Sequence, residues 1–296
     1  MKKLIPLFLL GLLFITCSKK DEKLSPPTSS GIELKQNRIS FNDEKSYTDI
    51  ISKYQTDESS ALNLLKPYKP KLLKSSTVES INSADSLYDP FLLEILNEDK
   101  IVEIGEWIIK VDMPNNKVFA LHINDSVYIN DLKDNQSNEK IYTFAPDQEV
   151  LKILNDSIKP GLKSTTGIFC GARYASSDYD KDDELYGDRY RLKCRLEYNK
   201  FGILFTIVAE VTNQTRLLGI WTPCDGDLWI NYEGSWTPRC KGIQTKTDYC
   251  SNCQTAAKSK TVRLYYDIRA LESYGVKAQF YNYGTDGYSR RYEIAN

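Results

Sequence analysis

The sequence predicts an α+β region followed by a mostly antiparallel β domain, sandwich- or barrel-like and cross-linked by disulfides. Helical spacings of apolar residues are concentrated in the first half of the 296 residues. Alternation of apolar and polar residues, which is typical of half-buried strands, dominates the second half. Six of the seven cysteines lie between Cys170 and Cys253, and an even number of cysteines in an exported chain indicates disulfides.

The first half is predicted to begin with helices. Over residues 49–65 apolar side chains recur at helical spacing, and Pro67 ends the pattern. Asp89 and Pro90 are the residue types of an N-cap and a first helical position, so we expect a short helix that continues to residue 96.

Strand formers follow these helices. The β-branched stretch 100–111 predicts a strand, Asn115 and Asn116 predict a turn, and residues 118–123 predict a returning strand. A last helix is expected over residues 146–154.

The second half is predicted to consist of strands joined by turns. Alternation recurs in residues 190–198, 203–211, 262–268 and 274–280. Trp-Thr-Pro-Cys at 221–224 returns as Trp-Thr-Pro-Arg-Cys at 236–240, and Glu233-Gly234 predicts a turn between them. We therefore expect a hairpin that joins Cys224 to Cys240, although other connectivities stay open. The disulfide candidates are Cys170, Cys194, Cys224, Cys240, Cys250 and Cys253.

The N-terminus has the pattern of an export signal. Two lysines precede a short apolar run that ends at Cys17, and no apolar run reaches the roughly 18–20 residues of a membrane-spanning helix. The segment Phe14-Ile15-Thr16-Cys17 resembles the lipoprotein box of Bacteroidota, and residues 96–108 resemble a recurrent segment of uncharacterised lipoproteins of that group. The resemblance implies that Cys17 is lipidated and anchors the chain in the outer membrane, on its inner face or exposed at the surface.

These features divide the chain into four parts. We expect a lipoprotein signal peptide at 1–16, a lipidated cysteine with a flexible tether at 17–45, an α+β region at 46–163 and a cysteine-containing β domain at 164–296. The tether is indicated by a Pro/Ser/Gly cluster at residues 25–31, which has no apolar periodicity.

Composition excludes several functions. The formal net charge of −1 gives no reason to expect a nucleic-acid partner. The single histidine, His122, disfavours His-based catalytic triads, and we expect it in a strand with a local hydrogen-bond partner. Paired carboxylates could still hydrolyse a glycosidic bond, but the sequence does not single out a pair among 40 acids.

One acidic stretch is the candidate metal site. Asp178, Asp180 and Asp182 have the alternate spacing of calcium ligands, although the position where an EF-hand has glycine is Asp183. We expect no cofactor and a solvated acidic loop, with Ca²⁺ as the alternative.

The binding candidates are aromatic and basic residues of the β domain. They are Trp221, Trp229, Trp236, Arg189, Arg191 and Arg195. Tryptophans stack on sugar rings and a basic strand face attracts anionic glycans, but the same residues are also ordinary components of a β core and its solvated exterior.

Three Asp-Ser-apolar tripeptides resemble the Bacteroidota O-glycosylation acceptor. Their serines are Ser86, Ser126 and Ser157.

Export and the absence of a recognisable catalytic motif favour a non-catalytic role. We expect a cell-envelope lipoprotein that binds a glycan or a surface protein, with the membrane as a second partner through the lipid. A carboxylate-dependent hydrolase of a surface polymer and a structural envelope component are the alternatives.

Overall fold

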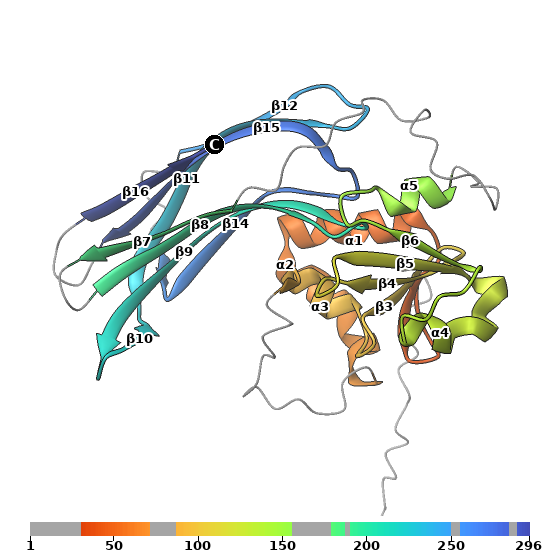
Figure 1. Ribbon diagram of the computed structural model, residues 1–296. Coiled ribbons are helices and arrows are strands. Elements are labelled where there is room, and N and C mark those ends of the chain that lie inside the picture. The colour runs from red at the N-terminus through yellow and green to blue at the C-terminus, as the bar shows by residue number, and fades with distance from the viewer. Residues whose placement is uncertain (1–30, 72–86, 156–178, 187–189, 250–254, 284–288) are drawn as a thin grey trace, which may run out of the picture. The chain divides into compact units, whose positions relative to one another are not determined.

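A computed structural model describes residues 31–71, 87–155, 179–186, 190–249, 255–283 and 289–296 (Figure 1). Residues 31–296 form one compact unit. The fold is mostly β, as predicted, with antiparallel sheets and a small helical N-terminal region. The predictions for residues 1–30, which include Cys17, lie outside the described residues.

The first sheet has six strands in chain order. Its strands are β1 (Ile32–Lys35), β2 (Arg38–Phe41), β3 (Ile101–Ile104), β4 (Trp107–Asp112), β5 (Lys117–His122) and β6 (Ile141–Phe144). All neighbouring pairs are antiparallel except β2 and β3, which are parallel. A parallel pair requires a long crossover, and the helical segment between β2 and β3 supplies it.

Helices cover both faces of this sheet. They are α1 (Glu44–Thr56), α2 (Glu58–Leu65), η1 (Lys66–Lys71), α3 (Pro90–Ile95), η3 (Ile123–Tyr128), α4 (Ile129–Lys133) and α5 (Val150–Asn155). Asp43, Asp57 and Asp89 cap α1, α2 and α3 through their carboxylates, and Pro90 begins α3 as predicted. One face of the sheet packs on α1, α2, α3 and α5, and the opposite face packs on Leu132 of α4.

Two further sheets form the C-terminal half. The first contains β7 (Tyr179–Tyr186), β8 (Tyr190–Lys200), β9 (Phe205–Leu217), β10 (Ile220–Pro223) and β14 (Ser259–Asp267). The second contains β11 (Gly226–Pro238), β12 (Gln244–Asp248), β13 (Thr255–Ala257), β15 (Leu271–Tyr283) and β16 (Ser289–Ala295). Every described pair in these sheets is antiparallel, and neither sheet closes into a barrel.

The two sheets share one core, as in a sandwich. In β8 the alternate residues Leu192, Cys194, Leu196 and Tyr198 are buried, which confirms the predicted alternation. They pack in one cluster with apolar residues of β9, β11 and β15.

A β-bulge in β14 changes which core its aromatic residues enter. The register between β14 and β9 shifts between Arg263 and Tyr265. Because of this shift, Tyr265 packs in the sandwich core whereas Tyr266 packs with the helices of the first region. Simple alternation over 262–268 predicted one face for Leu264 and Tyr266, and that prediction was wrong.

Two other predictions, the extent of the tether and the turn at Glu233-Gly234, are wrong because strands occupy these residues. The predicted tether is structured at its end, because residues 32–41 form β1 and β2 and α1 begins at Glu44. The predicted turn at Glu233-Gly234 is an uninterrupted part of β11. Gly234 is needed there for close packing, since an added Cβ would lie 3.0 Å from Val276 Cγ2 and 3.2 Å from Trp236 Cζ3.

The predicted Cys224–Cys240 disulfide fails for the same reason. Residues 226–238 run as one extended strand, which separates its ends by about 40 Å at roughly 3.3 Å per residue. Cys224 is a free thiol, and the buried Cys194 is also a thiol rather than half of a disulfide. Cys240 is disulfide-bonded, but to neither of these described cysteines. Cys170, Cys250 and Cys253 lie outside the described residues.

Among the described residues, no helix has both the length and the apolar character that crossing a membrane requires.

Candidate functional site

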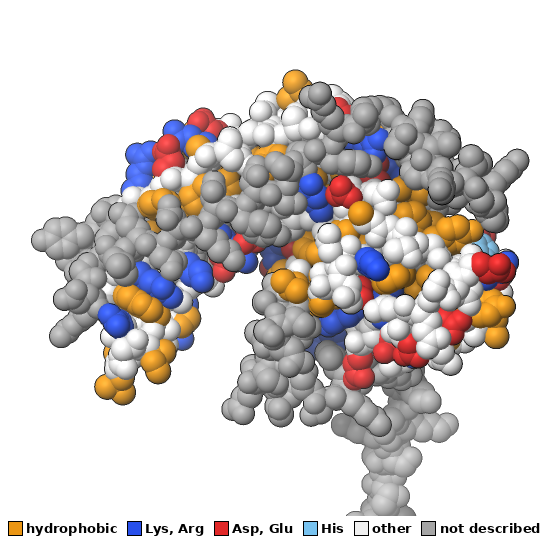
Figure 2. Space-filling view, viewed as in Figure 1, with side chains coloured by type: hydrophobic (Ala, Val, Ile, Leu, Met, Phe, Trp, Pro, Cys, Tyr) orange, Lys and Arg blue, Asp and Glu red, His pale blue; other side chains and the backbone are white. Residues whose placement is uncertain are grey.

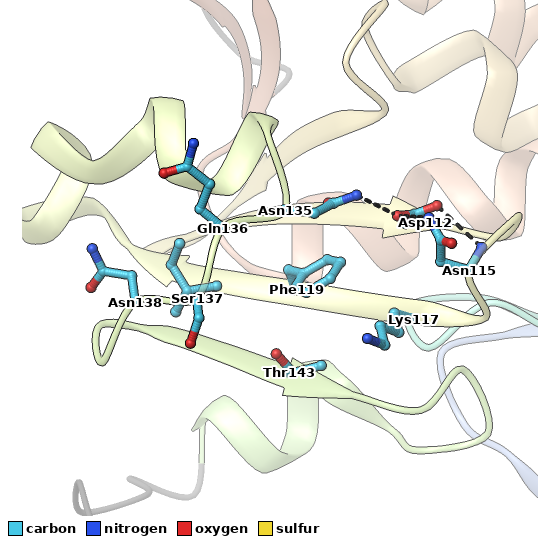
Figure 3. A pocket seen from close by; sticks show the side chains of 10 residues that line it. Asp112, Asn115, Lys117, Phe119, Asn135, Gln136, Ser137, Asn138 and Thr143 are labelled. Atoms are coloured by element: carbon cyan, nitrogen blue, oxygen red, sulfur yellow. Dashed lines mark hydrogen bonds between the residues drawn. The ribbon is translucent and has the colours of Figure 1, made fainter.

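A polar cleft lies on the face of the first sheet that also packs against α4. It has a volume of about 390 Å³, and we call it the amide cleft (Figure 3). It is lined by Asp112, Asn115, Lys117, Phe119, Asn135, Gln136, Ser137, Asn138, Ile141 and Thr143. Figure 3 shows β5 and β6 along its floor and the segment after α4 along one side.

Asp112, at the end of β4, organises one end of the cleft. Its carboxylate Oδ2 accepts hydrogen bonds of 2.8 Å from Nδ2 of Asn115 and from Nδ2 of Asn135. Asp112 is buried, and a buried carboxylate needs such donors to offset its lost hydration. The two amides therefore stand in fixed orientations at the rim.

Lys110 fixes the segment that follows α4. Its ammonium donates to the carbonyl of Lys133 at 2.5 Å and to Oδ1 of Asn135 at 2.8 Å, with a longer contact to the carbonyl of Leu132 at 3.4 Å. Burial lowers the pKa of Lys110, and nearby carboxylates such as Asp112 oppose that shift. The ammonium closes the end of α4 as a cation bound to its last carbonyl groups.

Asparagine suits the turns that form this rim. Asn116 and Asn135 have φ values of 52° and 56°, in the left-handed region that asparagine tolerates better than most residues. Asn138 donates to Asp131 at 2.6 Å and accepts from the backbone N–H of Lys140 at 2.9 Å. The polar run at residues 134–138 is the sequence signal from which the site could have been found.

The remaining lining groups are available to a ligand. Lys117, Gln136 and Thr143 are exposed, and no hydrogen bond to another described residue holds their side chains. Phe119 and Ile141 provide apolar surface below them. An amide offers both donors and an acceptor, as a hydroxyl group does, so the cleft complements a ligand with several hydroxyls and an apolar face.

The amide cleft has a lining that is mostly uncharged. Asp112 is the single carboxylate of its lining, and it is engaged by two amides. A glycosidase of the usual kind needs two carboxyl groups across the scissile bond. The described residues contain no group of three or more His, Cys, Asp or Glu side chains placed to hold a metal ion.

A second cavity, of about 340 Å³, lies between α3 and the sheet of β8, β9 and β14, and we call it the charged cleft. Its charged lining residues are Asp89, Arg195, Glu197, Glu210 and Arg263. Arg195 pairs with Glu197 at 3.4 Å and also with Glu210. Burial raises the pKa of Asp89, whose carboxylate caps α3 by accepting from the N–H of Phe91 at 2.8 Å.

The tryptophans predicted as a binding platform occupy three different environments. Trp236 is buried in the sandwich core, so it is not available to a surface ligand. Trp229 is half-buried and stacks on Tyr281, with ring centroids 4.7 Å apart and an interplanar angle of 5°. Trp221 is on β10 of the other sheet, where the guanidinium of Arg191 lies 4.7 Å from its ring centroid.

The described members of the predicted basic and acidic sets belong to neighbouring strands of one sheet, β7 and β8. Arg195 is occupied by two glutamates. Asp180 and Asp182 belong to strand β7 rather than to a loop, and they pair in register with Leu196 and Cys194 of β8. Arg189 and Asp178 lie outside the described residues.

Of the three predicted glycosylation serines, Ser126 is half-buried in η3, while Ser86 and Ser157 lie outside the described residues.

His122 ends β5, where its Nδ1 accepts a hydrogen bond of 3.2 Å from the N–H of Asn124. This is the local partner that the sequence predicted. Its ring also meets that of Trp107 edge-on at 4.9 Å.

Comparison with known proteins gives no precedent for this chain, since no family model, no curated protein and no solved structure matches it.

Proposed function

We propose that this protein is a non-catalytic module of the cell envelope that binds a glycan in the amide cleft. The observation that carries the proposal is the set of fixed and available polar groups above an apolar floor. Asn115 and Asn135 are oriented by Asp112, and the exposed lining residues Gln136 and Lys117 have no side-chain hydrogen-bond partners among the described residues.

The lining favours a sugar over other ligands of similar size. A strongly apolar ligand would leave the exposed amides without partners, which costs free energy. A polyhydroxylated ring can satisfy the amides through its hydroxyls and place its C–H face on Phe119 and Ile141. The cation of Lys117 also favours a glycan that carries an acidic group.

A glycan array tests the proposal directly. We expect the chain to bind a limited set of glycans, and we expect Gln136→Ala and Lys117→Ala to weaken that binding by about tenfold each, the magnitude of one lost hydrogen bond to a polar or charged group. Both side chains are exposed, so neither substitution should change the fold.

Matched controls are available close to the cleft. Asn130 and Lys140 are exposed and lie outside the lining, so Asn130→Ala and Lys140→Ala should bind the same glycans as the natural chain. Equal binding by all four variants would refute the amide cleft as the site. Absence of any bound glycan would favour the structural or protein-binding alternatives.

Hydrolysis of a surface polymer is a second candidate, and the charged cleft supports it. Asp89, Glu197 and Glu210 all line it, and the raised pKa of Asp89 is a property of catalytic acids. The glycans that bind should therefore be incubated with the protein and their products analysed. Product release that is abolished by Glu210→Gln, with the fold retained, would replace the binding-only proposal.

A further inference from the structure

The hairpin between β9 and β10 ends in an exposed apolar tip. Leu217, Leu218 and Ile220 are 59%, 102% and 70% exposed. The strands pair up to Ile220 and Leu217, so only Leu218 and Gly219 form the connection. Figure 2 shows hydrophobic side chains gathered at this end of the molecule, next to basic ones.

The conformation of this turn does not explain why position 218 is a leucine. Leu218 and Gly219 have φ values of 50° and 84°, and a two-residue turn with positive φ at both positions favours Asn-Gly. Leucine is disfavoured in the left-handed region by its Cβ. The protein therefore keeps a fully exposed apolar side chain at a position where asparagine would suit the backbone better.

Basic and aromatic groups lie directly behind the apolar tip. The guanidinium groups of Arg191 and Arg216 lie 4.7 Å and 5.9 Å from the ring centroid of Trp221. The Nε of Arg216 donates to the carbonyl of Gly219 at 3.4 Å. Residues 211–223 contain no aspartate or glutamate, so no acid within this segment opposes Arg216.

This order of chemical groups matches the depth profile of a bilayer surface. Aliphatic side chains enter the acyl region, tryptophan belongs at the interface, and arginines meet anionic headgroups. We propose that the 217–221 tip inserts into the surface of a membrane that contains anionic lipids. The proposal depends neither on the glycan site nor on the predicted lipid anchor, because both the tip and its arginines belong to the unit 31–296.

Vesicle co-sedimentation of residues 31–296 tests the proposal without any contribution from Cys17. Vesicles of phosphatidylcholine with about 30% phosphatidylglycerol should bind the protein roughly tenfold more tightly than vesicles of phosphatidylcholine alone. Leu218→Asp should reduce binding to the anionic vesicles about tenfold or more. Arg216→Ala should weaken binding to anionic vesicles and leave binding to neutral ones unchanged.

Two variants separate a lost tip from a lost fold. Leu218→Asn removes the aliphatic group but suits the turn, so it should fold normally and still lose several-fold in vesicle binding. Ile243 is an apolar residue that is 74% exposed elsewhere on the surface, and Ile243→Asp should bind vesicles like the natural sequence.

Three results would overturn the proposal. The first is failure of the natural sequence to sediment with anionic vesicles, and the second is unchanged binding of those vesicles by Leu218→Asp and Leu218→Asn. Analytical ultracentrifugation adds the third: self-association that Leu218→Asp abolishes, without any vesicle binding, would show that a second copy of the chain covers the tip instead.

Discussion

The two halves of the molecule bury their polar groups differently. In the first region, the buried Glu103 accepts from Arg38 at 3.0 Å and from Ser40 at 2.8 Å, and Lys110 and Asp112 hold the rim of the amide cleft. In the sandwich, the core consists of alternate apolar residues from facing sheets. On the opposite face of β9, the buried Thr206 hydroxyl has no hydrogen-bond partner among the described residues.

The difference explains where a ligand site can form. An alternating strand fixes its own side chains but leaves few polar groups free to be oriented. Short helices and turns, in contrast, require buried ions and amides to satisfy their ends, and those groups also orient their neighbours. The amide cleft therefore belongs to the cysteine-free region, while the sandwich contributes exposed strand ends such as the 217–221 tip.

The largest expected effect comes from breaking the buried ion pair of the first region. Arg38→Ala should lower the free energy of unfolding by about 3–5 kcal/mol, because it leaves the buried Glu103 carboxylate without its main cation. Chemical denaturation at pH 7 measures the loss. A loss of less than about 1 kcal/mol would contradict the importance of this network.

The same pair predicts a dependence on pH. Burial opposes ionisation of Glu103, but hydrogen bonds from Ser40 and Arg38 outweigh it and lower its pKa in the fold. The ionised Glu103 therefore contributes its full stabilisation at pH values above the pKa that this carboxyl has in the unfolded chain. That contribution is lost as the pH falls through its lowered pKa in the folded state. The difference in stability between the natural sequence and Arg38→Ala should shrink in acid.

The next effect tests whether the two regions unfold together. Gly202, between β8 and β9, has a φ of 77°, and an added Cβ would lie 2.8 Å from Val118 Cγ2 in the first region. Gly202→Ala should cost about 2–4 kcal/mol through backbone strain and overpacking. Because residues 31–296 form one unit, circular dichroism and tryptophan fluorescence should report a single unfolding transition, at a lower denaturant concentration than for the natural sequence. Two separate transitions would contradict unfolding of these residues as one unit.

A smaller effect of opposite sign is expected at Thr206, on the face of β9 that points away from the sandwich core. Thr206→Val removes a buried hydroxyl without a partner among the described residues and keeps the side-chain shape. The free energy of unfolding should rise by about 1 kcal/mol. A clear loss of stability would mean that the Thr206 hydroxyl stabilises the fold.

The smallest expected effect concerns the hairpin tip. Leu218→Asn should raise the free energy of unfolding by about 0.5–1 kcal/mol, because asparagine tolerates the left-handed backbone of this turn. Thermal unfolding of this variant beside Ile243→Asp measures it. Destabilisation by Leu218→Asn would mean that Leu218 serves the fold rather than a partner.

Much of the secondary structure follows from local signals. The capped start of α3 at Asp89-Pro90, the Asn115-Asn116 turn and the alternation of β8 are each encoded within a few residues. The β14 bulge and the straight path of β11 through Gly234 escaped prediction, because both depend on the neighbouring strand. The amide cleft escaped for a similar reason: Asp112 and Asn135 are 23 residues apart.

The sequence by itself determined the order of helical and strand segments and the faces that most strands bury, since these depend on local periodicity and capping. Only the tertiary structure decided which polar groups meet. It separated Trp221 from Trp236 onto different sheets, left Cys224 a thiol and gathered the amides of the rim around Asp112. Periodicity specifies which side of an element is buried, whereas a site requires groups from several elements at one point in space.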